Sequence, residues 1–269
     1  MKIAFIGDIV GKPGREMVKK YLKDLKKEYN IDLVIANTEN ASHGFGLSIK
    51  NANELLSYGI DFMTGGNHIW DKKDIIPFLD TLPIVRPLNY PKGVPGIGVK
   101  IIKLNNEEIA IINLMGHFTM PMVGNPFLSI KEEISRLQSI GIKNIFIDFH
   151  AEATSEKRAL FCILKAKVSA ICGTHTHIGT DDLMIDKGTF YVSDVGLSGC
   201  RDGVIGMDKE APLKRFLTGL PSSFDIPKKC KKILQFVVLD IFDGKCLDGY
   251  KIKIYDDKDE ISLQKAFLE

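Results

Sequence analysis

The chain has 269 residues, and its 36 basic and 34 acidic side chains give a formal net charge of +2 with histidine neutral. A hydrophobic share of 45% and a charged share of 26% are those of an ordinary globular protein, which excludes a collagen, a coiled coil and a disordered tail. The small net charge also argues against a protein that coats nucleic acid, because it gives no strong electrostatic footprint.

The sequence carries no targeting or membrane signal that we recognise. No stretch approaches the roughly 20 uninterrupted apolar residues of a membrane-spanning helix, and the first apolar run, Ile3–Gly7, is cut by Asp8. The five cysteines have no C-x-x-C spacing, so a zinc finger or a disulfide framework is not favoured. We expect a cytoplasmic protein with free thiols, no membrane partner and a single domain over residues 1–269.

The first part of the chain alternates short apolar runs with amphipathic segments. Strands are predicted at Lys2–Ile6, Leu33–Ala36 and Asp61–Met63. Helices are predicted from Pro13 through Leu25, from a Ser48 cap to Leu56, and over Asp71–Leu79, where Pro77 would kink or end the helix.

The later part of the chain adds hairpins to this alternation. Helices are predicted at Ser129–Ile140 and Ser155–Lys165, and strands at Asn144–Phe149 and Val168–Cys172. Asn105-Asn106 and Asp243-Gly244 are typical hairpin turns, the first between Val99–Leu104 and Glu108–Leu114, the second between Ile233–Phe242 and Lys245–Tyr255. This order favours an α/β core with antiparallel strands appended.

Polar side chains of metal-binding types follow the predicted strands. They are Asp8, Glu39, Asn40, Asn67, His68, His150, His175 and His177. Ligands gather at the carboxyl ends of the strands in an open α/β sheet, so residues far apart in sequence would meet in one cleft. Carboxylate, amide and imidazole groups without cysteine are a ligand set for iron, manganese or zinc.

Each of these residues taken alone also has a structural interpretation. Asp8 suits a turn, Glu39 and Asn40 suit an exposed loop, and any one histidine suits a half-buried hydrogen-bonded position. Four of the six histidines nevertheless follow predicted strands, which favours a shared site. His43 and His117 lie in loop-like sequence and are given no functional role.

The order of these residues resembles the motifs of the calcineurin-like metallophosphoesterase superfamily. Those motifs are D-x-H, G-D-x-x-D, G-N-H-[DE], a lone His and G-H-x-H. Here Val10 replaces the histidine of the first motif, and Glu39-Asn40 replaces the bridging aspartate motif. With Gly7–Gly11, Asp148–Lys157 and Asp194–Gly196, these departures resemble the bacterial YmdB-like group, over a similarity that runs to about Leu217.

The resemblance implies a four-layer αββα sandwich and hydrolysis of 2′,3′-cyclic nucleotides by a 2′-phosphodiesterase. It implies two metal ions, one held by Asp8, Glu39, Asn40 and His177 and the other by Glu39, Asn67, His150 and His175. Iron is our first choice, with manganese and zinc as alternatives. A hydroxide bridging the ions would attack phosphorus, and His68 would act as general acid, or else hold phosphate or position Asn67.

Two other functions stay open. One is a broader phosphomonoesterase or 5′-nucleotidase on the same centre, and the other is a regulatory binding protein with a vestigial centre. A homo-oligomer is compatible with the sequence. The lysine-rich stretch Lys209–Lys232 is interpreted as a solvated face, with RNA binding as the less favoured alternative.

Three weaker features are noted. Arg86 and Arg201 would each place a cation near the substrate or pair with a surface carboxylate. The apolar loop Met115–Phe127 is interpreted first as core, with a base-stacking wall or a subunit contact as alternatives.

Overall fold

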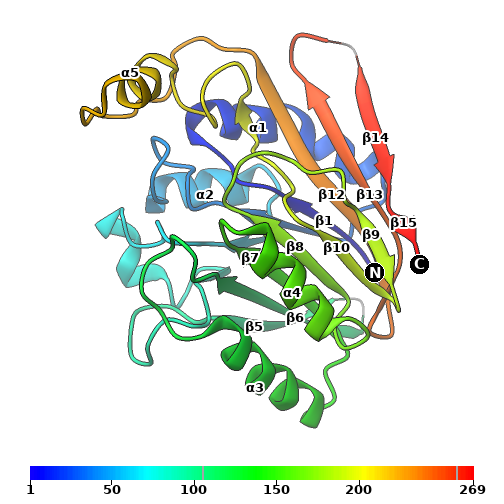
Figure 1. The fold of residues 1–269 in the computed structure, drawn as a ribbon. Coiled ribbons are helices and arrows are strands. Elements are labelled where there is room, and N and C mark those ends of the chain that lie inside the picture. The colour runs from blue at the N-terminus through cyan, green and yellow to red at the C-terminus, as the bar shows by residue number, and fades with distance from the viewer. Residues whose placement is uncertain (105, 259) are drawn as a thin grey trace.

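Two β-sheets packed face to face form the centre of the computed structural model, which describes residues 1–104, 106–258 and 260–269 (Figure 1). The first sheet has the order β14 (Ile261–Lys265), β13 (Lys245–Tyr255), β12 (Lys232–Phe242), β1 (Lys2–Ile6), β2 (Leu33–Asn37), β3 (Phe62–Thr64) and β4 (Ile84–Val85), and β11 (Gly199–Cys200) also pairs with β12. The second has the order β15 (Phe267–Leu268), β9 (Met184–Asp186), β10 (Thr189–Val192), β8 (Ala170–Thr174), β7 (Asn144–His150), β6 (Glu107–Met115) and β5 (Val99–Leu104).

The central strands are mostly apolar because both of their faces are buried. Ile3 and Phe5 of β1 point between the two sheets, where Phe5 meets Phe146 of β7 with ring centroids 4.9 Å apart. Ala4 and Ile6, one residue out of phase, point to the opposite face and contact the helices there. The period-two alternation of a strand therefore supplies two hydrophobic layers from one apolar run.

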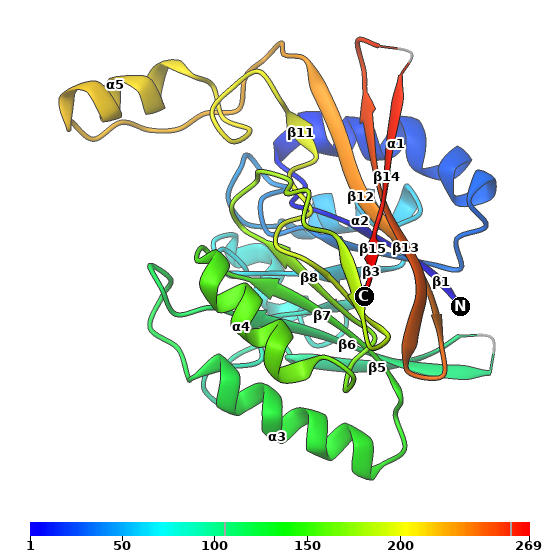
Figure 2. The same ribbon diagram turned by 45° about the vertical axis from the view of Figure 1, so that its right-hand side comes forward.

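Helices cover the outer face of each sheet (Figures 1 and 2). On the first sheet lie α1 (Gly11–Glu28), α2 (Ile49–Ser57) and the short 3₁₀ helix η1 (Lys73–Phe78), and on the second lie α3 (Pro126–Ser139) and α4 (Thr154–Leu164). The layers run helix, sheet, sheet, helix, so the predicted four-layer αββα sandwich is confirmed. The remaining helix, α5 (Glu210–Thr218), projects away from the two sheets.

Most predicted elements are present, and two of the predicted helices differ. The segment predicted as a helix over Asp71–Leu79 is a 3₁₀ turn containing Pro77, since proline removes a backbone donor inside a helix. Helix α3 begins at Pro126, earlier than predicted, because the Asn125 side chain accepts hydrogen bonds from the next turn. The hairpin of β5 and β6 is confirmed by its register, although Asn105 of its predicted turn lies outside the described residues.

Parallel pairing brings the carboxyl ends of several strands to the same edge. In the first sheet β1, β2, β3 and β4 run parallel to one another, and in the second sheet β6, β7, β8 and β10 do the same. The predicted site residues follow β1, β2, β3, β7 and β8. Among the described residues no helix combines the length and the apolar character that crossing a membrane requires.

Candidate metal centre

Residues from the ends of both sheets meet around the carboxylate of Glu39. Its Oε1 lies 2.9 Å from Nε2 of His150 and 3.3 Å from Nδ2 of Asn40. Its Oε2 accepts a hydrogen bond of 2.9 Å from the backbone N–H of His68. Glu39 and His150 are both essentially inaccessible to solvent. Two sheets thus place a carboxylate and an imidazole against each other at the bottom of the site.

Gly66 makes this approach possible. A Cβ atom at that position would collide with Oε2 of Glu39 and would lie 2.6 Å from Cδ2 of His150. No side chain can therefore replace the hydrogen of Gly66 without separating the two residues. The adjacent Asn67 completes this part of the site, because its Oδ1 lies 3.0 Å from Nε2 of His150.

His150 is held in one orientation by a buried polar network. Thr174 Oγ1 donates to Oδ1 of Asp148 at 2.6 Å, so the hydroxyl oxygen of Thr174 accepts from Nδ1 of His150 at 2.9 Å. Asp148 also accepts from Thr64 Oγ1 at 2.5 Å and from Asn37 Nδ2 at 2.9 Å. With the proton fixed on Nδ1, the lone pair of Nε2 points into the site, as a metal-ligating histidine requires.

His175 approaches His150 from β8. Its Nδ1 lies 3.1 Å from Nε2 of His150, while its Nε2 lies 3.2 Å from the Glu152 carboxylate. If Nε2 of His175 donates to Glu152, two imidazole lone pairs face each other. Such a contact is repulsive unless a proton or a metal ion lies between the rings. Glu39, His150 and His175 offer ligand atoms that all lie within 4.8 Å of one another.

His177 is fixed in the same way on the other side of the site. Its Nδ1 lies 2.8 Å from the carbonyl oxygen of Ile205, which can only accept, so Nδ1 carries the proton. The free Nε2 then faces Nδ2 of Asn40 at 3.1 Å and Oδ1 of Asp8 at 3.7 Å. Asn40 presents its amide nitrogen here, and a half-turn of the amide would present its oxygen instead.

A backbone bend lets both histidines face one site. His175 and His177 have φ values of 96° and 63°, in the left-handed region that residues with a Cβ seldom adopt. Asp194 holds the bend, because its Oδ2 accepts from the N–H and the hydroxyl of Thr176 at 3.1 and 2.8 Å. The buried Lys157 ammonium lies 3.0 Å from the same carboxylate. The backbone strain is therefore concentrated where the predicted ligands come together.

Asp8 indicates most directly that a cation fits this site. Its carboxylate is fully buried, and its Oδ1 has no hydrogen-bond partner among the described residues. Burial raises the pKa of Asp8, against the opposing effect of His177 and His150. A buried oxygen without a partner is costly, and a metal ion in contact with it removes that cost.

The protonation states reflect the same crowding of charge. Burial disfavours charge on His150, but the Glu39 carboxylate outweighs it and raises the pKa of His150 to about 9. Burial works against Glu39 as well, yet His150 lowers its pKa to about 2. Burial, followed by the charge on His150, lowers the pKa of His175 to about 3. The charged forms of Glu39 and His150 therefore stabilise each other at the bottom of the site.

An apolar cavity of about 190 Å³ opens above these residues. Its floor contains Glu39, Asn40, His175 and His177, and His68 lies at its side. Its walls are apolar and come from Phe45 and from the segment around α5: Val204, Ile205, Met207, Pro212, Phe216 and Phe224. The site thus combines a polar floor with an apolar wall, the pattern of a small-molecule pocket.

The imidazole of His68 is oriented by its neighbours at the side of this cavity. Its Nδ1 lies 2.7 Å from Oδ2 of Asp71, and its ring packs edge-on against Phe45 with centroids 5.1 Å apart. Its Nε2 has no hydrogen bond to the described residues. This nitrogen is available to a ligand in the cavity.

The sequence did not identify the residues that orient the ligands. Asp148, Thr174 and Asp194 act through contacts between elements, and Ile205 acts through its backbone carbonyl. Asp148 had one signal, since it is a carboxylate within the apolar run from Ile145 to Phe149.

The weaker features have other roles. Arg201 pairs with Asp257 at 2.8 Å, and Arg86 donates to the carbonyl of Pro87, and neither lines this cavity. The interpretation of the Met115–Phe127 loop as core is wrong in part: Met115 is buried, but Phe118 and Met122 are 65% and 100% exposed because the loop leaves the sheet after β6.

Comparison with known proteins gives a consistent result. Residues 4–252 match the model of a family described as YmdB-like protein. The chain is 47% identical over 261 residues to a Bacillus subtilis (strain 168) protein named 2′,3′-cyclic-nucleotide 2′-phosphodiesterase, covering 96% of this chain and 98% of that protein.

Solved structures extend the comparison. A crystal structure described as a novel phosphatase from Mycoplasma pneumoniae is 36% identical, with a TM-score of 0.88 over 96% of this chain and 95% of that one. A 5′-nucleotidase precursor from Thermus thermophilus is 12% identical with a TM-score of 0.53, over 99% of this chain and 54% of that one, and shares the fold alone.

Proposed function

The chain belongs to the YmdB-like protein family, and we propose that it is a metal-dependent phosphodiesterase that hydrolyses 2′,3′-cyclic nucleotides at the 2′ bond. The observation that carries this proposal is the meeting of Glu39, His150 and His175 with ligand atoms within 4.8 Å of one another. The Bacillus subtilis relative, whose name states this activity, aligns with almost the whole chain.

Two metal ions fit the donor set. Asp8, Glu39, Asn40 and His177 would hold one, and Glu39, Asn67, His150 and His175 would hold the other, with Glu39 shared. The partnerless oxygen of Asp8 and the facing nitrogens of His150 and His175 support this assignment. When bound, the ions would supply a bridging hydroxide as nucleophile and neutralise the charge of the phosphate. Iron is the favoured metal, and manganese and zinc also suit these ligands.

In the proposed mechanism, other residues of the protein orient the histidines that would bind metal. Asp148 and Thr174 direct Nδ1 of His150, and the Ile205 carbonyl directs Nδ1 of His177, so the Nε2 atom of each ring is aimed into the site before substrate arrives. Because these side chains are already in place, they need not move during the reaction, and the site can stabilise the negative charge that develops on the phosphate in the transition state.

His68 is the proposed general acid. Asp71 holds Nδ1 at 2.7 Å, so Nε2 is the nitrogen left to a ligand in the cavity that His68 lines. As the oxygen of water bonds to phosphorus and loses one proton to solvent, the P–O2′ bond breaks. His68, as an imidazolium with Nδ1–H on Asp71, donates its Nε2 proton to the departing 2′-oxygen and is left neutral. The products are a free 2′-hydroxyl and a 3′-phosphate, and the ring strain of the cyclic phosphate is released.

The apolar walls suit the nucleoside. A cavity of about 190 Å³ beside His68, lined by Phe45, Phe216 and Phe224, offers aromatic surfaces to a nucleobase. The polar floor and the apolar wall would therefore contact the phosphate and the base of one nucleotide.

The test is the product formed from 2′,3′-cyclic AMP by metal-loaded protein. We expect adenosine 3′-phosphate rather than the 2′-isomer, resolved by ion-exchange chromatography, and little release of phosphate from adenosine 5′-phosphate. Faster turnover of the monoester would favour a 5′-nucleotidase instead. Loss of turnover in His68→Ala with an intact cellular phenotype would favour a regulatory binding protein.

A further inference from the structure

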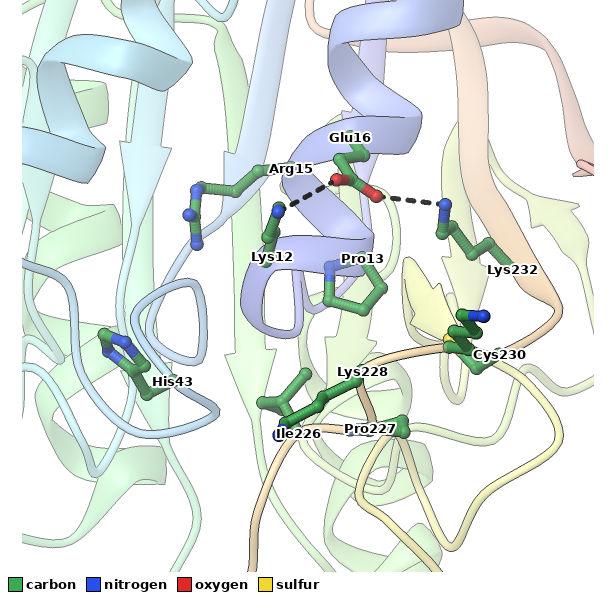
Figure 3. A pocket seen from close by; sticks show the side chains of 11 residues that line it. Lys12, Pro13, Arg15, Glu16, His43, Ile226, Pro227, Lys228, Cys230 and Lys232 are labelled. Carbon is green, nitrogen blue, oxygen red and sulfur yellow. Dashed lines mark ion pairs between the residues drawn. The ribbon is translucent and has the colours of Figure 1, made fainter.

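A second cavity, of about 560 Å³, lies at the start of α1 and is lined mainly by cationic side chains (Figure 3). Lys12 and Arg15 come from α1 and His43 from the loop after β2. Lys228 and Lys229 come from the segment that leads into β12, and Lys232 is the first residue of that strand. Figure 3 shows the α1 residues facing Ile226 and Lys228 across this space. Glu16 is the one acidic residue among its described lining residues.

Part of this positive charge is unbalanced. Glu16 is already paired with Lys232 at 3.0 Å and with Lys12 at 3.7 Å, and Arg15 is paired with Glu54 at 2.9 Å. Lys228 and Lys229 are exposed and form no ion pair or hydrogen bond with the described part of the chain. A cavity lined by one sign of charge attracts an anion of the opposite sign.

The cationic cavity adjoins the apolar cavity above the metal ligands. His43 and Ile226 line the cationic cavity. Their near neighbours in sequence, Gly44 and Phe224, line the apolar cavity. A Cβ on Gly44 would lie 2.6 Å from Cε of Met207 and 3.1 Å from Cδ1 of Ile226, so these residues are in close contact between the cavities. The same two short segments therefore line both the proposed nucleotide site and the cavity that contains the unpaired lysines.

We propose that the cationic cavity binds the phosphodiester on the 5′ side of the terminal nucleotide, so that the preferred substrates are short oligoribonucleotides ending in a 2′,3′-cyclic phosphate. This inference rests on the function proposed above. A 2′,3′-cyclic mononucleotide carries a single phosphate, which the metal ligands would engage, and it leaves Lys228 and Lys229 without an anion.

Contacts between lysine and phosphate also predict which oligonucleotides the cavity would prefer. Lysine is a flexible point charge that binds phosphate without reading a base. A net charge of +2 does not favour a long basic surface that would bind many phosphates of an RNA strand. The cations of this cavity are confined to one place, next to the proposed nucleotide site. We therefore expect a preference for one additional 5′ nucleotide of any base, and little further gain with longer strands.

The first experiment changes the substrate and leaves the protein as it is. We compare kcat/KM for 2′,3′-cyclic AMP, for the dinucleotide adenylyl-adenosine 2′,3′-cyclic phosphate, and for the same dinucleotide with a neutral methylphosphonate linkage. We expect the charged dinucleotide to exceed both others by about 10-fold or more, as for a charge-assisted phosphate contact. Equal values for the charged and neutral dinucleotides would overturn the inference.

The second experiment changes the cavity. In Lys228→Glu/Lys229→Glu, the ratio of kcat/KM for the charged dinucleotide to that for 2′,3′-cyclic AMP should fall about 10-fold. The matched control Lys131→Glu/Lys167→Glu alters the same number of exposed lysines, on α3 and after α4, and should keep the wild-type ratio. An unchanged ratio in the first variant would contradict the inference while the mononucleotide activity stands. Absence of turnover with every substrate would instead overturn the proposed function, and this inference with it.

Discussion

Nδ1 of His175 lies 3.1 Å from Nε2 of His150, and the other nitrogen of each ring is directed at a hydrogen-bond acceptor, Glu152 and Thr174 respectively. Two imidazoles in this arrangement need a shared positive charge between them. Burial lowers the pKa of His150, but the neighbouring Glu39 carboxylate outweighs this effect and raises that pKa to about 9, so the surroundings of His150 favour positive charge. In the working protein we assign that place to a metal ion.

Replacing His175 tests this assignment. His175→Ala should reduce the metal content from about two ions per chain to about one and lower turnover of 2′,3′-cyclic AMP by about 10²-fold or more, since one electrostatic stabiliser is lost. Metal is measured by inductively coupled plasma mass spectrometry. His117→Ala removes an exposed histidine outside the site and should change neither quantity. Full metal content in His175→Ala would contradict the assignment.

Metal binding should depend on the hydroxyl group of Thr174, and a side chain of similar size without that hydroxyl should not replace it. Thr174→Val removes the acceptor for Nδ1 of His150 and the donor to Asp148, and should weaken metal binding by about 10–100-fold, as for other residues that orient a ligand. Thr174→Ser keeps the hydroxyl and should restore most of the affinity. Metal titration of the two apo-variants measures the difference. Equal affinities would show that the network does not position His150.

His68 separates acid catalysis from metal binding. His68→Ala should lower kcat for 2′,3′-cyclic AMP by about 10²–10⁴-fold with unchanged metal content. With bis(p-nitrophenyl) phosphate the loss should be below about 10-fold, because nitrophenolate departs without a proton. The comparison of the two substrates is the measurement. A similar loss with both would indicate that His68 holds phosphate or positions Asn67 instead.

The stability of the fold should depend on pH through Lys251, which lies outside the candidate site. The ammonium is fully buried and donates to the carbonyls of Thr180 and Asp194 at 3.2 Å, and burial, followed by Lys253, lowers its pKa to about 8 from 10.5. Between these values the unfolded chain binds more protons, so the free energy of unfolding should rise with pH from about 8 to 10.5, by up to about 3 kcal/mol. Urea unfolding of wild type and Lys251→Met across this range should show the rise in the wild type alone. Parallel pH profiles would contradict it.

The sequence predicts the parts of the fold that follow from local pattern. Runs such as Lys2–Ile6 and Leu33–Ala36 have no polar face, which identifies strands buried on both sides, and the ligand types follow these strands. The strands Ile84–Val85 and Met184–Asp186 and the helix Glu210–Thr218 were not predicted. A strand of two or three residues has too few positions to show a period, so tertiary pairing defines it.

The same distinction applies within the site. The predicted ligands are recognisable by residue type and by resemblance to known motifs, and the structure brings Asp8, Glu39, His150 and His177 together. The bend at His175–His177 depends on Asp194, and the tautomer of His177 depends on a carbonyl of the loop after β11. Neither contact has a periodic or compositional signature, because each joins segments that pack only in the folded chain.

The central claim is tested most directly by counting metal in protein purified without chelator and assaying the same sample with 2′,3′-cyclic AMP. We predict about two ions per chain and a product that is adenosine 3′-phosphate, with both lost on chelation and recovered on adding metal back. The opposite result would be folded protein that binds no more than one ion tightly after exposure to iron, manganese and zinc, and that leaves the cyclic phosphate intact. That result would contradict the proposed two-metal phosphodiesterase.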